Sequence, residues 1–238
     1  ITEEESGWVL NERLIASEKI PVPKINTQSE PNVLPRLVNS MRNFFGAEGF
    51  MPALFTTAFS VAGLFYDEIQ REEGFFPVLG LYGDAGTGKT LAAVTALSLL
   101  GFDHRAKINK ASESAYHERF KLMGGLTQFL DDPDKAQISW VCQQIKSQFG
   151  GGSRSVRENS QDPHSPLIVA SNYSIGDDDP IILSRLIRLE FAGTPNPAAF
   201  PELRAMSRIC SSALPDLIKI GYDQKGIKDL ESQLIIKL

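Results

Sequence analysis

The stretch Phe75–Thr90, FFPVLGLYGDAGTGKT, decides the fold class of this chain of 238 residues. Its apolar first half is typical of a short buried strand, and its second half is rich in glycine. The residues Leu91–Leu100 that follow form a strongly apolar stretch that is typical of a helix. The order strand, glycine loop, helix predicts an α/β domain with a P-loop nucleotide site where the strand ends.

The glycine loop matches the pattern Gly-x-x-x-x-Gly-Lys-Thr, in which the glycines allow successive backbone N–H groups to surround phosphate oxygens. We expect Lys89 to place its ammonium between the β- and γ-phosphates of ATP, and the Thr90 hydroxyl to bind Mg²⁺. ATP and Mg²⁺ are therefore the predicted cofactors. The ATP contacts predicted from this loop are Gly83, Asp84, Ala85, Gly86, Thr87, Gly88, Lys89 and Thr90.

The bulk composition favours a globular domain. Hydrophobic residues make up 42% of the chain, and the net charge of −5 excludes a surface that is positive all over. The longest apolar stretch, Phe50–Tyr66, is slightly short for a bilayer, and we predict a helix buried against a sheet rather than a membrane span. Cys142 and Cys210 lack metal-ligand spacing and suit an intracellular protein, in either cytoplasm or nucleus. Because the chain begins at Ile1, we expect it to be part of a longer polypeptide.

Four more apolar runs predict further strands. They are separated by helical or loop-like segments, as in a parallel sheet with crossover helices. The runs are Leu126–Leu130, Pro166–Ala170, Leu186–Phe191 and a weaker one at Ala106–Ile108.

The chain divides into four predicted segments. Residues 1–32 mix acids and prolines with few periodic apolar positions and predict an arm or linker. Residues 33–74 carry apolar positions at three- and four-residue spacing and predict a helical segment. Residues 75–192 are the predicted ATPase core, and residues 193–238 a second helical segment.

Two carboxylates follow the run that ends at Leu130. A P-loop ATPase needs a carboxylate at the end of a neighbouring strand to hold the metal and its waters. We assign Asp131 to Mg²⁺ and Asp132 to activation of the attacking water.

Two polar residues mark the next two runs. Asn172 ends the third run, where it could hold the attacking water or sense the γ-phosphate, or simply begin a turn. Arg185 precedes the fourth run, where its forked guanidinium could stabilise charge on the γ-phosphate of another subunit or form a surface salt bridge. The residues alone leave both pairs of alternatives open.

The ordered motifs of the chain resemble those of the superfamily 3 helicases of small DNA viruses, plasmids and mobile elements. The likeness rests on the glycine loop, on FLDD at Phe129–Asp132, on SPLIVASN at Ser165–Asn172 and on LSR at Leu183–Arg185. Papillomavirus-type replication helicases are similar at each motif. The likeness covers residues 75–191, about half of the chain, and extends to helicase domains of primase-helicases in mobile elements.

This resemblance implies an AAA+-like core with a five-stranded parallel sheet, assembled as a homo-oligomeric ring, in the family a hexamer. In such a ring Arg185 would complete the ATP site of its neighbour, and Asn172 would be the polar sensor. A primase module in the same polypeptide is also implied as a partner.

The resemblance further implies a hairpin between the second and third motifs that grips one DNA strand by its phosphates. Arg154, Arg157 and His164 are the DNA contacts predicted there. Papillomavirus members carry a Lys-His pair that has no match at these positions.

The leading hypothesis is an ATP-driven DNA helicase or translocase that acts on single-stranded DNA in the replication of a viral, plasmid or mobile element. The alternative is an AAA+-type assembly or switch ATPase without unwinding activity, which the sequence pI of about 5.3 favours. A small-molecule kinase of P-loop type would leave Asn172 and Arg185 unexplained.

Overall fold

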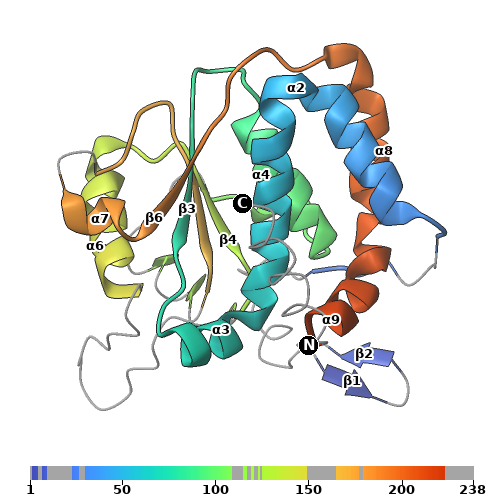
Figure 1. The fold of residues 1–238 in the computed structure, drawn as a ribbon, viewed down its shortest axis with the longest axis horizontal. Helices are drawn as coiled ribbons and strands as arrows, with labels where there is room; N and C mark the ends of the chain where they lie inside the picture. Colours follow the sequence, from blue (N-terminus) through green and yellow to red (C-terminus); the bar gives the residue numbers. More distant parts are fainter. Residues whose placement is uncertain are drawn as a thin grey trace, which may run out of the picture.

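Helices cover both faces of a central parallel sheet in the computed structural model (Figure 1). The residues described are 2–4, 7–9, 23–26, 30–108, 115–116, 119–120, 123, 125–148, 165–176 and 179–222. The predicted DNA contacts Arg154, Arg157 and His164 lie outside them.

The sheet has four parallel strands in the order β4-β5-β3-β6. In chain order they are β3 (Val78–Tyr82), β4 (Gln128–Asp131), β5 (Leu167–Ala170) and β6 (Leu186–Glu190). These four strands were predicted, and they are confirmed. The fifth predicted strand is not: Ile108 makes one isolated parallel bridge with Leu130 beyond β4. The pairing is this short because a 3₁₀ turn, η2 (His104–Ala106), occupies the residues before it.

Side chains of the strands alternate between two apolar layers, as the pleat of a sheet requires. Leu79 and Ile168 face the layer formed by α2 (Val33–Ala62), α4 (Lys89–Leu99) and α8 (Phe200–Ile209). The opposite layer contains α6 (Lys135–Gln148) and the single turn α7 (Pro180–Leu183). The two inner strands, β3 and β5, are buried at every position, which is the reason their sequences are continuously apolar, whereas the edge strand β6 contains Arg188 and Glu190.

Helix α2 is two helices joined at a kink. Gly46, with φ 67° and ψ −170°, breaks the helical geometry. The second part runs on through η1 (Gly63–Phe65) into α3 (Tyr66–Glu73). By length and composition the stretch Val33–Glu73 could cross a membrane, but half of its most apolar window is buried inside the fold. Such burial is typical of a core helix.

The segment 23–26 lies beside Gly101, just after α4, and beside Ser211 in the C-terminal part of the chain. In the segment 23–26, the Lys24 N–H donates to the carbonyl oxygen of Gly101 (2.7 Å), and the Asn26 N–H donates to Ser211 Oγ (2.9 Å). The C-terminal elements are η3 (Pro197–Ala199), α8, η4 (Cys210–Ala213) and α9 (Leu214–Tyr222). At the N-terminus, the short strand β1 (Thr2–Glu4) pairs antiparallel with β2 (Gly7–Val9).

Candidate nucleotide-binding site

The glycine loop joins β3 to α4 and needs glycine at its two ends. Gly83 has φ 138°, and a Cβ atom there would lie 2.2 Å from the carbonyl oxygen of Phe191. Gly88 has φ 96° and would bring a Cβ atom within 2.9 Å of the Phe45 ring. These conformations turn the loop so that α4 begins at Lys89, with the positive end of its dipole towards the pocket.

Lys89 is fixed by three acceptors. Its ammonium donates to the carbonyl oxygens of Gly83 and Asp84, both at 2.7 Å, and to Oδ1 of Asn172 at 3.0 Å. The side chain is 7% exposed, and burial lowers the pKa of Lys89, whereas the nearby aspartates, Asp132 first, raise it. An ammonium has three donors, so this contact set uses all of them.

Asp131 lies at the end of β4, opposite the first turn of α4. The Thr90 hydroxyl donates to Oδ1 of Asp131 at 2.8 Å, and the Lys107 ammonium contacts Oδ2 at 2.9 Å. The carboxylate therefore meets both the hydroxyl that was predicted to bind Mg²⁺ and a lysine that sequence reasoning missed. The weak strand at Ala106–Ile108 could have revealed Lys107, because a strand beside β4 places its residues near Asp131.

Two loops at the same edge of the sheet are joined to each other. Asp132 has a left-handed conformation, φ 49°, and its N–H donates to the carbonyl oxygen of Ala170 at 2.9 Å. The Tyr173 hydroxyl donates to the carbonyl oxygen of Pro133. Through these bonds the loop after β4 is held beside the loop that carries Asn172.

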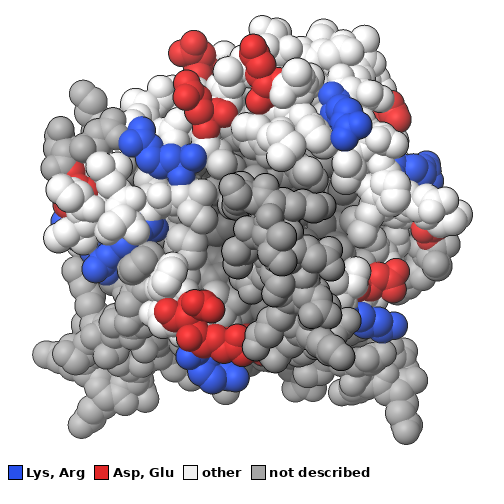
Figure 2. Space-filling view, in the orientation of Figure 1, with Lys and Arg blue, Asp and Glu red and all other residues white. Residues whose placement is uncertain are grey.

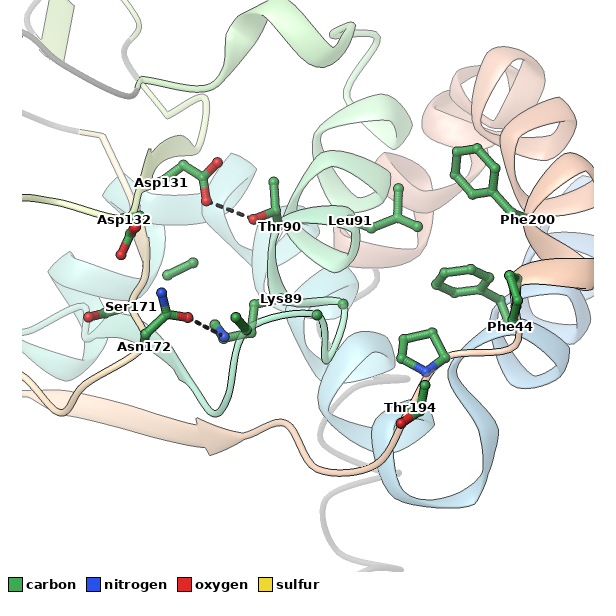
Figure 3. Close-up of a pocket in the computed structure, with 16 residues that line it drawn as sticks. Phe44, Lys89, Thr90, Leu91, Asp131, Asp132, Ser171, Asn172, Thr194 and Phe200 are labelled. Carbon is green, nitrogen blue, oxygen red and sulfur yellow. Dashed lines mark hydrogen bonds between the residues drawn. The ribbon is translucent and has the colours of Figure 1, made fainter.

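These groups line one pocket with a volume of about 770 Å³. Figure 3 shows Lys89, Thr90, Asp131, Asp132 and Asn172 at one end and aromatic side chains at the other. The size and the mixed lining are typical of a small-molecule site. The full lining comprises Phe44, Ala85, Gly86, Gly88, Lys89, Thr90, Leu91, Asp131, Asp132, Ala170, Ser171, Asn172, Thr194, Pro195, Pro197 and Phe200.

The apolar end of the pocket was not predicted. Phe44 comes from α2 and Phe200 from the start of α8, with ring centroids 6.0 Å apart. The Asn196 N–H donates to the carbonyl oxygen of Phe44 at 2.7 Å and holds the intervening turn, which carries Pro195 and Pro197, beside α2. An apolar end next to a phosphate-type loop is suited to a nucleotide base. Nothing in the sequence signals this, since the two helices are far apart along the chain.

Arg185 lies away from the pocket, at the amino edge of the sheet. Its carbonyl oxygen accepts from the Val78 N–H at 3.1 Å, at the start of β3, whereas the glycine loop follows the end of β3. Its guanidinium donates to the carbonyl oxygen of Lys146, near the end of α6. Phe191, the neighbour of Gly83, lies six residue steps beyond Arg185 along β6, or about 20 Å at 3.3 Å per residue.

Charged side chains of both signs are interspersed over the face seen in Figure 2. No continuous basic stripe crosses the described residues of this face. The hairpin residues expected to touch DNA are outside the described chain.

The structure thus brings together most of the predicted site residues. The loop Gly83–Thr90, Asp131, Asp132 and Asn172 meet around one pocket, and Arg185 does not. Their chemical roles remain predictions.

Comparisons with known proteins concern the fold. The sequence matches no protein-family profile and no curated protein sequence. Among solved structures, the chain is similar to an active helicase, SCCmec type IV Cch, with a TM-score of 0.59 and 16% identity. The match covers 82% of this chain and 38% of that one. The chain therefore shares a fold with a helicase and spans well under half the length of that protein.

Two other similar structures have lower scores. The JCV helicase matches with a TM-score of 0.40 and 14% identity, over 87% of this chain and 68% of that one. The C-terminal region of NrS-1 matches with a TM-score of 0.40 and 15% identity, over 89% of this chain and 50% of that one.

Proposed function

We propose that this chain is an ATP-hydrolysing motor domain that moves on or unwinds DNA. The observation that carries the proposal is the convergence of Lys89, Thr90, Asp131 and Asn172 at the mouth of the glycine loop, within 2.7 to 3.0 Å of one another or of the loop carbonyls. Such a set offers a cation, a hydroxyl, a carboxylate and an amide to a triphosphate. The apolar end of the same pocket would take the base.

The residues present also fit Mg²⁺. This cation prefers hard oxygen ligands and keeps several waters, and Thr90 and Asp131 supply a hydroxyl and a carboxylate that already touch. When bound with ATP, Mg²⁺ would neutralise charge on the phosphate oxygens.

The chain's own groups would perform the remaining steps. Lys89 would exchange its loop carbonyls for phosphate oxygens, which as anions are the stronger acceptors. Asp132 would take the proton of the attacking water, and Asn172 would hold that water through its amide. The position of Asp132 in the lining of the same pocket supports this role.

We propose further that copies of the chain form a ring in which Arg185 acts on the neighbouring ATP. The separation of about 20 Å from its own loop supports action between subunits, because an arginine side chain does not span it. The motif order, which resembles superfamily 3 helicases of viruses, plasmids and mobile elements, supports DNA as the track. The fold shared with an active helicase agrees with this.

The test is the ATPase rate with and without single-stranded DNA, combined with the particle mass in the presence of ATP. We expect Mg²⁺-dependent hydrolysis that DNA stimulates, oligomers that form with nucleotide, and DNA binding that weakens steeply as salt increases. Hydrolysis that ignores DNA at every salt concentration would rule out the motor.

An assembly or switch ATPase is the second candidate. It is favoured by the interspersed charges of Figure 2 and by the net charge of −5. In that case ATP would still drive oligomerisation, but Arg154→Ala combined with Arg157→Ala would leave the activity unchanged. For a DNA motor the same double variant would lose DNA stimulation.

A further inference from the structure

Lys107 makes a contact that the proposed ATPase cycle does not use. Its ammonium lies 2.9 Å from Oδ2 of Asp131, while the Thr90 hydroxyl occupies Oδ1. The Asp131 side chain is only 12% exposed and that of Lys107 is 31% exposed, so water screens this ion pair less than one on the open surface. The carboxylate assigned to Mg²⁺ is thus charge-compensated by the protein itself.

Lys107 is positioned by two backbone hydrogen bonds that Ile108, the next residue, makes with β4. The Ile108 N–H donates to the carbonyl oxygen of Phe129 at 2.8 Å, and the Asp131 N–H donates to the carbonyl oxygen of Ile108 at 2.9 Å. The single parallel bridge beyond β4 therefore holds the backbone of the segment that carries Lys107 beside Asp131.

A hydrogen bond from Arg119 holds Ala106, the residue before Lys107. The Arg119 guanidinium donates to the carbonyl oxygen of Ala106 and to Oε1 of Gln128, the latter at 2.8 Å. Ala106 directly precedes Lys107, and Gln128 begins β4. The segment that carries the lysine is fixed to the strand that carries Asp131 at both ends.

A fixed ammonium and a divalent cation on one carboxylate oppose each other. Two cations a few ångströms apart repel each other, and the repulsion is stronger in a partly buried site than in bulk water. A triphosphate brings enough negative charge to outweigh that repulsion, whereas the carboxylates among the described residues that line the pocket are Asp131 and Asp132.

We propose that Lys107 is a positioning residue that makes metal entry depend on the nucleotide. In the nucleotide-free chain it orients Asp131 and lowers the affinity for a free divalent cation, so that the cation enters with ATP. The inference rests on the proposed function, because it takes Asp131 as the metal carboxylate.

The test is Mn²⁺ binding to the nucleotide-free protein, followed by electron paramagnetic resonance of the free ion. We expect Lys107→Met to bind Mn²⁺ about tenfold more tightly than the unaltered chain. Lys107→Arg keeps the charge and should bind as the unaltered chain does. Lys146→Met is the control: it also removes a lysine from an ion pair, with Asp179 at 2.5 Å, but at the other edge of the sheet. This variant should bind Mn²⁺ as the unaltered chain does.

Equal or weaker Mn²⁺ binding by Lys107→Met would overturn the proposal, because a purely structural lysine would disorder Asp131 when removed. Should the methionine variant fail to fold, Lys107→Gln keeps a donor for Asp131 without the charge and carries the same expected increase. Binding of Mn²⁺ with a non-hydrolysable ATP analogue separates the two proposals. If the unaltered chain binds no nucleotide, the proposed function fails; if it binds and only the Lys107 effect is missing, this inference alone fails.

Discussion

The two edges of the central sheet are built from similar residues but do different things. At the carboxyl edge, Lys89 and Asp131 bind groups from neighbouring loops and surround a pocket. At the amino edge, Arg185 and Lys146 bind groups of α6 and α7, and Lys146 pairs with Asp179 at 2.5 Å. One edge points its cations towards a cavity, and the other uses them to hold helices in place.

This difference explains why the proposed role of Arg185 in ATP hydrolysis would require a second copy of the chain. All parallel strands end at the same edge, so loops after β3, β4 and β5 converge on one pocket. Arg185 precedes β6 and therefore belongs to the opposite edge, whatever the side chain does. For Arg185 to act on ATP as proposed, a second copy would have to bring its amino edge to this pocket.

The largest expected effect is at the carboxyl edge. Lys89→Ala should reduce ATP hydrolysis by more than about 10³-fold and weaken ATP binding, since no other ammonium lies within the glycine loop. Steady-state ATPase and binding of a fluorescent ATP analogue measure both. Lys146→Ala removes an equal charge from the amino edge and should leave both unchanged; equal losses would erase the distinction between the edges.

Arg185→Ala should reduce hydrolysis by about 10³-fold while ATP binding stays within a few-fold. Mixing it with Lys89→Ala should restore part of the activity, because one interface in the mixed ring keeps an intact loop and an intact arginine. Arg188→Ala is the matched control on β6, the strand that follows Arg185; the Arg188 guanidinium lies over the Tyr82 ring at 5.2 Å. Activity that stays absent on mixing would place Arg185 outside the reaction.

A smaller loss is expected from the amide in the pocket. Asn172→Ala should slow hydrolysis by about 10²-fold with little change in ATP affinity. Asn172→Asp keeps an oxygen that accepts from Lys89 but loses the amide N–H groups. Single-turnover rates of both variants decide between the two functions of the side chain: retained activity in Asn172→Asp would mean that only the Lys89 contact matters.

The glycine loop also predicts a difference in stability. Gly83→Ala should lower the free energy of unfolding by about 3 kcal/mol, because its Cβ atom would collide with the backbone of Phe191, the residue that follows β6. Gly86 has φ 85°, but a Cβ atom added there would have no atom within 4 Å. Gly86→Ala should therefore lower the free energy of unfolding by about 1 to 2 kcal/mol, from backbone strain alone. Urea unfolding measures both. Equal losses would contradict the close approach of the loop to β6.

The smallest effect concerns pH at the amino edge. The hydrogen bond from Lys146 and the N–H of Ile181 hold the pKa of Asp179 below its usual range. Because this pKa is depressed in the folded state, the pair stabilises the fold above the unfolded pKa, and that contribution disappears as pH falls through the folded value. NMR titration should show the Asp179 pKa rising in Lys146→Ala. A pKa unaffected by that change would mean that the cap of α7 alone sets it.

The sequence predicted the strands and the polar end of the site more fully than the rest of the pocket. Asp131 and Asn172 could be found because each follows an apolar run, and parallel strands end at a common edge. Phe44 and Phe200 could not, because their contact depends on how α2 and α8 pack together. The contact of Lys107 with Asp131 was not predicted either, because the expected strand beside β4 consists of one bridging residue, Ile108.

The sequence by itself determined the glycine loop, the order of the strands along the chain and the kinds of side chain available to bind a triphosphate. These properties are local: glycine conformations, apolar periodicity and the residue that follows each strand. The tertiary structure decided which groups actually meet. It placed Lys107 on Asp131, closed the apolar end of the pocket with two distant helices, and put Arg185 at the opposite edge, because contacts between distant residues follow from packing and register rather than from spacing along the chain.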